Sequence, residues 1–170
     1  MKIKISLLAC MVSIALSSGC VSNQIGAKHE NNLDKAAILY KEGATLEEGG
    51  ADNFLEVESK YIEAAKLGSV DALNALGVLY MKTENYSKAQ KYFGEAVKKG
   101  DEIASFNLAN MELTNAYSEP NINKAIELYS YSADKKYAPA LVALGDIYAT
   151  GKGVSVNFDK AETYYLKGAD

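Results

Sequence analysis

Several residue types that active sites require are scarce in this chain of 170 residues. It contains one histidine, His29, together with two cysteines, two prolines and no arginine. A single histidine in a polar N-terminal stretch excludes Ser–His–Asp and Cys–His catalytic arrangements and most zinc sites. We therefore expect no enzyme activity, no metal and no cofactor. The scarcity of proline, which interrupts helices, favours an all-α fold.

Basic residues are outnumbered by acidic ones, 18 to 22, which gives a net charge of −4. An acidic chain without arginine lacks the basic face that binding to nucleic acid requires. It also has no basic cluster that would attract it to anionic lipid headgroups. We expect no nucleic-acid partner and no small-molecule substrate. A protein or peptide partner is the ligand class that we expect.

The first 19 residues have the organisation of a targeting segment. Lys2 and Lys4 precede an apolar run of 12 residues, which is too short to span a bilayer. The run is followed by Ser17-Ser18-Gly19-Cys20. Small residues before a cysteine resemble the bacterial lipobox, in which the cysteine is lipidated and becomes the new N-terminus. We assign residues 1–19 to a lipoprotein signal peptide and Cys20 to the lipidation site.

An ordinary secretory signal cleaved near Gly19, with Cys20 left as a free thiol, is the alternative. Lipidation explains why a secreted chain would keep one unpaired cysteine, since Cys10 is lost with the signal. The absence of aspartate after Cys20 resembles outer-membrane sorting, so we expect a lipid anchor at the periplasmic face of the outer membrane. Polar residues 20–32 are expected to form the lipidated cysteine and a flexible tether.

An asparagine followed by an apolar set recurs four times in the rest of the chain. With the asparagine counted as offset zero, apolar residues recur at offsets 1, 4, 8 and 12, which share one helical face. The asparagines, spaced 32, 36 and 36 residues apart, are Asn53, Asn85, Asn121 and Asn157. The offset-8 residues are Tyr61, Phe93, Tyr129 and Tyr165. The pattern predicts one amphipathic helix after each asparagine.

A second pattern, small-x-x-x-Leu followed by glycine or alanine, precedes each of the last three asparagines. It comprises Ala72-x-x-x-Leu76-Gly77, Ala104-x-x-x-Leu108-Ala109 and Ala140-x-x-x-Leu144-Gly145, with Tyr80 and Tyr148 three residues after the glycines. Glycine inside a helix costs about 1 kcal/mol relative to alanine. Its use here predicts close helix packing. A degenerate fourth copy lies at Gly43-Ala44.

Capping residues set the predicted ends of these helices. Each asparagine is expected to accept a backbone N–H as an N-cap. Gly68 and Gly100 lie where a left-handed helix cap favours glycine. Lys136 stands at the same place in the third copy, so we expect a less regular turn there. The predicted helices are 33–48, 54–67, 70–82, 86–99, 102–115, 122–135, 138–150 and 158–169.

The last copy has the full signature Leu144-Gly145-x-x-Tyr148, Gly151-x-Gly153-Val154 and Lys160-Ala161-x-x-Tyr164-Tyr165. It resembles the Sel1-like repeat family, which is related to tetratricopeptide repeats. The middle copies lack the Gly-x-Gly-Val loop and look closer to tetratricopeptide repeats. The resemblance covers residues 33–170. It implies a short right-handed α-solenoid of about four antiparallel helix pairs that serves as a binding scaffold.

By analogy with tetratricopeptide repeats, residues three before and one after each glycine position would line a concave face. A partner-binding groove is therefore predicted at Asn74, Val78, Phe106, Asn110, Val142 and Asp146. Its polar members could bind a peptide backbone; a merely solvated face is the alternative. The predicted last helix has no following repeat, so its apolar face is expected either to be exposed or to be covered by something else.

Three functions are compatible with these features. We favour a lipid-anchored, non-catalytic scaffold or adaptor for protein–protein interaction in the bacterial cell envelope. A structural protein associated with peptidoglycan is the second. An envelope hydrolase is the third, and the lack of a usable histidine or cysteine argues against it. The adjacent Glu47 and Glu48 do not form a catalytic pair, since neighbouring residues diverge around a helix.

Overall fold

The computed structural model describes residues 31–50, 53–114 and 119–169. The predicted signal peptide, Cys20, His29 and most of the predicted tether lie outside these residues. All regular elements in the described ranges are helices. A helix over residues 31–48, here called the N-terminal helix, comes first. It is followed by α2 (Phe54–Lys66), α3 (Val70–Lys82), α4 (Tyr86–Lys98), α5 (Glu102–Glu112), α6 (Ile122–Asp134), α7 (Ala138–Thr150) and α8 (Phe158–Ala169).

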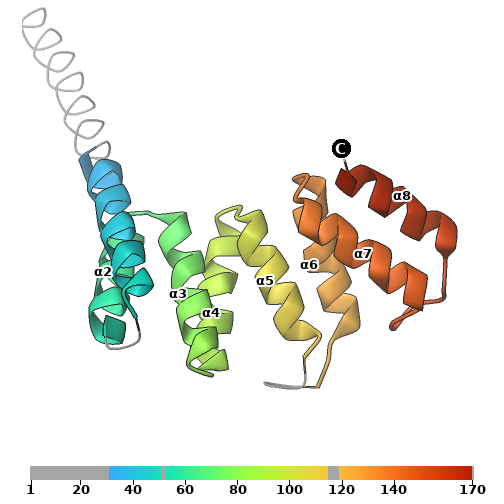
Figure 1. The fold of residues 1–170 in the computed structure, drawn as a ribbon, viewed down its shortest axis with the longest axis horizontal. Helices are drawn as coiled ribbons and strands as arrows, with labels where there is room; N and C mark the ends of the chain where they lie inside the picture. The colour runs from blue at the N-terminus through green and yellow to red at the C-terminus, as the bar shows by residue number, and fades with distance from the viewer. Residues whose placement is uncertain (1–30, 51–52, 115–118, 170) are drawn as a thin grey trace, which may run out of the picture.

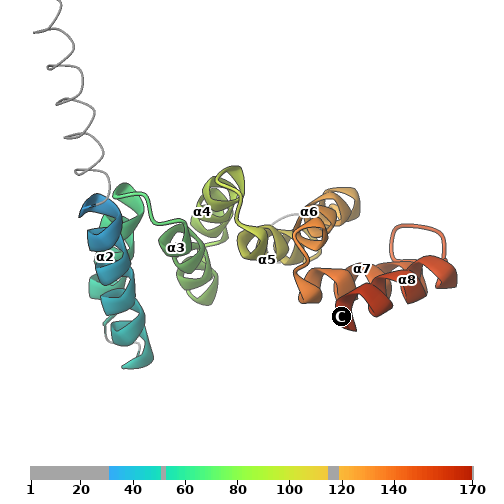
Figure 2. The same ribbon diagram turned by 90° about the horizontal axis from the view of Figure 1, so that it is seen from above.

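Consecutive helices form pairs that follow one another along the molecule in chain order (Figure 1). The N-terminal helix and α2 lie at one end, and α7 and α8 lie at the other. Figure 2 shows the same row of pairs from above, with each pair beside the next. This arrangement confirms the predicted all-α solenoid of four helix pairs. We call the first helix of each pair the A helix and the second the B helix.

Helix boundaries agree closely with the predicted spans. α3, α7 and α8 match at both ends, while α2, α4 and α6 each end one residue earlier than predicted. The predicted end of α5 at residue 115 is wrong, because the helix stops at Glu112. The backbone N–H of Asn121 donates a 2.7 Å hydrogen bond to the Glu112 carbonyl, which a longer helix would need for itself. The N-terminal helix includes Asn31 and Asn32, which the sequence analysis placed in the tether.

Three of the four repeat asparagines cap a helix. Asn85, Asn121 and Asn157 accept backbone N–H bonds of 3.3, 3.1 and 2.9 Å from the lysine three residues on. The prediction was wrong for Asn53, whose side chain makes no capping bond. Its backbone has φ −101° and ψ 13°, in the bridge region rather than the extended conformation from which a cap reaches the first turn.

Lys136 does not disturb its turn, contrary to expectation. It adopts φ 63°, and its backbone N–H donates to the Ala133 carbonyl at 2.8 Å. Gly100, with φ 96°, makes the equivalent bond to Val97 at 2.9 Å. The next residue in each turn also bonds back into the helix in the same way. The third copy therefore keeps the regular turn and places a lysine in the left-handed region, at a cost in conformational energy.

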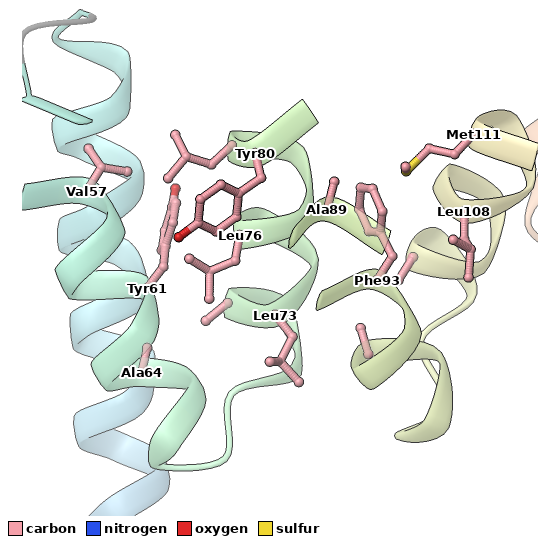
Figure 3. Close-up of a cluster of buried hydrophobic side chains, with 14 of the residues drawn as sticks. Val57, Tyr61, Ala64, Leu73, Leu76, Tyr80, Ala89, Phe93, Leu108 and Met111 are labelled. Carbon is pink, nitrogen blue, oxygen red and sulfur yellow. The ribbon is translucent and has the colours of Figure 1, made fainter. Parts of the chain in front are cut away.

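The core consists of the apolar sets that define the repeat (Figure 3). Ala72, Leu76 and Tyr61 are among its fully buried residues. A Cβ atom added to Gly77 would lie 2.5 Å from the Phe93 ring, so this glycine lets α3 and α4 approach closely. Gly43 and Gly145 stand in the same relation to Tyr61 and Tyr165. The predicted packing role of these glycines is confirmed.

Buried side chains form two clusters along the row. The larger extends from the N-terminal helix to α5, and the smaller extends from α5 to α7. Leu128 of α6 packs against both. Since each cluster is built from neighbouring helices, stability is expected to depend mainly on contacts between adjacent pairs.

Candidate partner-binding groove

A hollow of about 480 Å³ lies beside the A helices of the first three pairs. Its lining combines acidic side chains with apolar and aromatic ones. The residues are Tyr40, Ala44, Glu47 and Glu48 of the N-terminal helix, Tyr61 of α2, Asp71, Asn74, Ala75, Val78 and Lys82 of α3, and Asp101 and Ile103 at the start of α5. Three successive helix pairs thus contribute to one concave surface.

Two of the six predicted groove residues, Asn74 and Val78, line this hollow. The Asn74 side-chain oxygen accepts a 3.0 Å hydrogen bond from the Asn107 amide nitrogen. This bond links α3 to α5 and fixes the orientation of one amide at the edge of the hollow. Asn74 and Val78, which the sequence predicts as groove residues, therefore lie where an elongated ligand could reach them.

Phe106 and Asn110 of α5 do not line the hollow. Phe106 is half-buried, and its ring centroid lies 5.6 Å from that of Tyr129 and 5.4 Å from that of Tyr137. Asn110 accepts a 2.5 Å hydrogen bond from the Tyr129 hydroxyl. Burial raises the pKa of Tyr129 to about 12. Both predicted groove residues therefore help to hold the third helix pair together.

Val142 and Asp146 of α7 are exposed but lie away from the hollow. Asp146 accepts a 2.7 Å hydrogen bond from the Tyr165 hydroxyl, and this bond raises the pKa of the Tyr165 phenol. The structure therefore separates the predicted set into two residues that line the hollow and four that lie outside it, two on α5 and two on α7. The prediction that these six residues form one partner-binding groove remains untested.

Acidic residues dominate the charge of the hollow. Glu47 accepts hydrogen bonds from the Tyr61 hydroxyl at 2.8 Å and from Lys82 Nζ at 2.6 Å. Burial raises the pKa of the Asp101 carboxyl, backbone N–H groups of Ala104 and Ile103 lower it, and the charges of Glu102 and Asp71 raise it further. Burial also raises the pKa of Tyr40, and the charges of Asp71 and Glu47 add to this effect. The hollow therefore offers a negative environment beside apolar side chains.

The contribution of the N-terminal helix to the hollow was not predicted, although its signal is present in the sequence. The rule of three before and one after the glycine, applied to Gly43, selects Tyr40 and Ala44, and both line the hollow. Asp71 lies one helical turn before Asn74 on α3, and Glu47 lies one turn after Ala44 on the N-terminal helix, so both belong to the same faces. The rule was not extended to the degenerate first copy, and Asp146 was the only acidic residue in the predicted groove.

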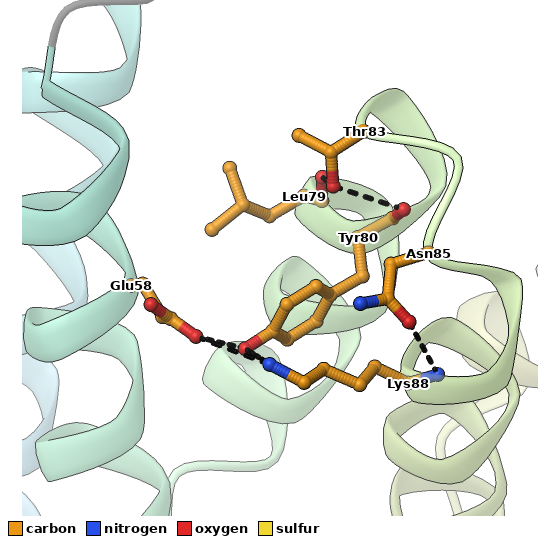
Figure 4. A network of polar contacts seen from close by, with 6 residues as sticks. All are labelled: Glu58, Leu79, Tyr80, Thr83, Asn85 and Lys88. Carbon is orange, nitrogen blue, oxygen red and sulfur yellow. Dashed lines mark hydrogen bonds and ion pairs between the residues drawn. The ribbon is translucent and has the colours of Figure 1, made fainter.

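A polar network joins the first two pairs (Figure 4). The Tyr80 hydroxyl of α3 donates to the Glu58 carboxylate of α2. Lys88 Nζ of α4 lies 3.8 Å from Glu58 Oε1 and 4.5 Å from the centroid of the Tyr80 ring. The Tyr80 ring also stacks on Tyr92, with centroids 5.5 Å apart and an angle of 3° between the ring planes. One tyrosine thus binds three helices together.

No group of three or more histidine, cysteine, aspartate or glutamate side chains in the described ranges is arranged to hold a metal ion. None of the described helices is both long and apolar enough to cross a membrane. One Ser-x-x-Lys sequence, a motif of β-lactam-active hydrolases, occurs at Ser132-Ala133-Asp134-Lys135 and was missed in the sequence analysis. Ser132 is fully buried, and its hydroxyl donates to the Glu102 carbonyl at 2.7 Å, so this serine is structural.

The paired helices and their repeated core define the class of protein as an α-solenoid built from short helical repeats. Residues 70–101 match the model of the tetratricopeptide repeat. Residues 103–137 and 138–170 match the model of the Sel1 repeat. The chain therefore contains both repeat types, and both are typical of scaffolds for protein–protein interaction.

Solved structures have the same fold. A Sel1 repeat protein from Oxalobacter formigenes is similar with a TM-score of 0.71 and 24% identity, over 79% of this chain and 57% of that one. A protective antigen present in uropathogenic Escherichia coli strains, displaying an SLR fold, is similar with a TM-score of 0.65 and 29% identity. That match covers 83% of this chain and 32% of the antigen. This chain thus spans less than two thirds of either protein. No curated protein matches it.

Proposed function

We propose that this protein is a lipid-anchored, non-catalytic adaptor of the bacterial cell envelope. The hollow beside the first three A helices would bind a basic, extended segment of a partner protein. The anchor at Cys20 would hold that partner at the periplasmic face of the outer membrane. The repeat types support the general role of interaction scaffold, while the anchor, the compartment and the chemistry of the partner are our inference.

The observation that carries the proposal is the composition of the hollow. Glu48, Asp71 and Asp101 come from three successive helix pairs and line one surface, where Tyr40 and Ile103 supply apolar contact. A basic segment with interspersed apolar residues would complement both features. Such electrostatic complementarity contributes mainly to the rate of association and to specificity.

Lipid anchoring rests on the N-terminal sequence alone. The apolar run that ends at Leu16 is followed by Ser17, Ser18 and Gly19, and then by Cys20. A thioether at that cysteine would place the repeat domain near the bilayer without a membrane-spanning helix. Because one acyl chain gives only marginal membrane binding, stable retention would need more than one chain at the cysteine.

The groove is tested by affinity capture from detergent-solubilised envelope with the lipidated protein. Glu48→Lys would add a positive charge at the edge of the hollow. Glu127→Lys makes the same charge change on the exposed side of α6, outside the hollow, and is the matched control. We expect a basic partner to be retained by the parent and by the control, and lost by Glu48→Lys. Equal capture by all three proteins would contradict the assignment of the groove.

Substitution of Asn110 or Asp146 is unsuitable for this test, because each accepts a hydrogen bond from a tyrosine of the next helix and would leave that hydroxyl unpaired. Asn74→Ala is the better second variant, since it removes an amide at the hollow and leaves those tyrosines paired. Retention of the protein on purified peptidoglycan sacculi, with no protein partner captured, would favour the structural alternative instead.

Anchoring is tested separately by Cys20→Ala. We expect the parent to fractionate with membranes and to have the mass of a lipidated chain, and the variant to be released in soluble form. Unchanged membrane retention and unchanged mass would rule out lipidation at Cys20. Soluble release together with preserved partner capture would show that the groove and the anchor act independently.

A further inference from the structure

The outer face of α8 has nearly the same residues as the face of α2 that packs on α3. At offsets 1, 5 and 8 from the preceding asparagine, both helices have phenylalanine, glutamate and tyrosine. Offset 9 is Ile62 in α2 and Leu166 in α8, and offset 12 is alanine in both. The other two B helices lack this set, because offset 5 is Gln90 in α4 and Ile126 in α6.

The role of this face is visible on α2, where α3 covers it. Glu58, at offset 5, accepts a hydrogen bond from the Tyr80 hydroxyl of α3. Phe54, at offset 1, meets the same tyrosine ring edge-on, with centroids 6.2 Å apart and ring planes at 71°. Figure 4 shows the Glu58 carboxylate directed at the Tyr80 hydroxyl. The face therefore recognises a helix through one tyrosine, which contacts a phenylalanine and a glutamate together.

On α8 the same face is open within the part of the chain that the structure describes. Phe158 is 71% exposed and Leu166 is 63% exposed. A hollow of about 500 Å³ lies between them, and Glu162 and Tyr165 are in its lining. The equivalent Phe54 and Ile62 on α2 pack against the larger core cluster. α8 thus presents a helix-binding face of known chemistry without the helix that would complete it.

We propose that α8 binds one helix of a partner protein, in the position that α3 takes on α2. The partner helix would have a small residue, a leucine and a tyrosine at successive four-residue spacings, as Ala72, Leu76 and Tyr80 have on α3. The small residue allows close approach, the leucine fills the space beside Tyr165, and the tyrosine hydroxyl donates to Glu162.

The N-terminal helix of a second copy does not meet these requirements. At the positions of Ala72, Leu76 and Tyr80 it has Ile38, Glu42 and Leu46. A carboxylate would then lie at the apolar centre of the contact, where burial without a partner is unfavourable. Leu46 has no hydroxyl for Glu162. The two ends of the solenoid are therefore not complementary to each other, and the N-terminal helix of a second copy does not fit this face.

The face on α8 lies in the last helix pair, at the opposite end of the row from the N-terminal helix (Figure 1). The acidic hollow is lined instead by residues of the N-terminal helix, α3 and α5. The two surfaces have no residue in common. The inference is therefore independent of the proposed adaptor groove, and either can fail without the other.

The test uses a fluorescent peptide with the sequence of α3, Val70–Lys82, held helical by a cross-link on its solvent-facing side. Binding to the whole mature protein is measured by fluorescence anisotropy. We expect saturable binding to the parent, and no binding to Phe158→Ser. Leu55→Ser removes an apolar side chain that is 76% exposed on α2, outside the proposed face, and is the matched control. It should bind the peptide as the parent does.

A second peptide, in which phenylalanine replaces the tyrosine, tests the hydrogen bond between the tyrosine hydroxyl and Glu162. It should bind the parent about ten-fold more weakly, since a hydrogen bond to a charged group would be lost. The two peptides should bind Glu162→Ala equally. No saturable binding to the parent, or equal binding to Phe158→Ser, would overturn the proposal. Self-association of the parent in sedimentation, abolished by Leu166→Asp, would also overturn it and would assign the face to a second copy.

Discussion

The ring of Tyr165 lies against the backbone of Gly145, where a Cβ atom would be 2.4 Å from Tyr165 Cε1. The hydroxyl of the same ring reaches the residue after the glycine, Asp146. In the third pair, Tyr129 bonds in the same way to Asn110. In the second pair the aromatic residue is Phe93, which has no hydroxyl, and the acceptor position holds Val78. In the last three pairs the residue after the glycine position is thus matched to the aromatic residue of the next helix, whereas in the first pair Ala44 follows Gly43 and the Tyr61 hydroxyl donates to Glu47 instead.

Replacement of Gly145 should therefore destabilise the last pair. Gly145→Ala would force the Tyr165 ring to shift, and we expect the free energy of unfolding to fall by about 1–3 kcal/mol, with a larger loss for Gly145→Leu. Gly94→Ala in α4 is the control, because its Cβ would meet no atom within 4 Å. It should raise stability by about 0.5–1 kcal/mol. Equal urea midpoints for the two alanine variants would show that the ring does not constrain residue 145.

Lys136→Gly should stabilise the protein. The lysine has φ 63° in a turn that glycine forms in the two preceding copies. Relief of the left-handed strain should raise the free energy of unfolding by about 1 kcal/mol. Gly100→Ala, the reverse change in the equivalent turn, should lower it by a similar amount. Thermal melts of both variants measure the effect, and a lower melting temperature for Lys136→Gly would contradict the account of this turn.

Lysine recurs three residues after the repeat asparagine, and its replacement should lower the free energy of unfolding most in the third pair. Lys124 is ion-paired with Glu112, whose side chain is only 7% exposed. Lys160 instead lies 4.8 Å from the ring centroid of the neutral Tyr148. Lys124→Met should cost about 1–3 kcal/mol, because it leaves a buried carboxylate with less compensation. Lys160→Met should cost about 0.5–1 kcal/mol. Equal losses in urea unfolding would show that the burial of Glu112 has no energetic consequence.

Stability should fall at alkaline pH because of the buried tyrosines. Burial raises the pKa of Tyr129 to about 12, and it also raises the pKa values of Tyr61 and Tyr80. Tyrosine in the unfolded chain titrates near pH 10. The folded state therefore holds these protons more tightly, and the stabilisation is complete below about pH 10 and is lost as the pH rises towards 12. Urea unfolding at increasing pH should show a shallower decline for Tyr129→Phe; an identical decline would exclude Tyr129 as a contributor.

Local pattern was sufficient to predict the helices and their pairing. The offsets of 1, 4, 8 and 12 describe one face of one helix, and the glycines at 77 and 145 predict close packing of helices. The predictions of helix caps and turns were wrong where the backbone conformation differed from the one that the residue type favours. Asn53 does not cap, because its backbone lies in the bridge region rather than the extended one, and Lys136 adopts a left-handed conformation that the rule assigns to glycine.

The candidate sites were less predictable from sequence. Asn110 and Asp146 have the polarity expected of groove residues, yet each accepts a hydrogen bond from a tyrosine 19 residues further along the chain. The acidic hollow could not be found in one repeat, because Glu48, Asp71 and Asp101 belong to three different pairs. Its position depends on how the pairs stack.

The amino-acid sequence by itself determined that this protein is a row of paired helices, because helical periodicity, capping residues and glycine positions act over a few residues and repeat along the chain. Glycines inside the helices also predicted that the two helices of a pair pack closely. Only the tertiary structure decided which faces remain open, since exposure depends on the neighbouring pair. The stacking leaves an acidic hollow beside the first three A helices and an uncovered copy of the α2 face on α8, and these two surfaces are where partners are proposed to bind.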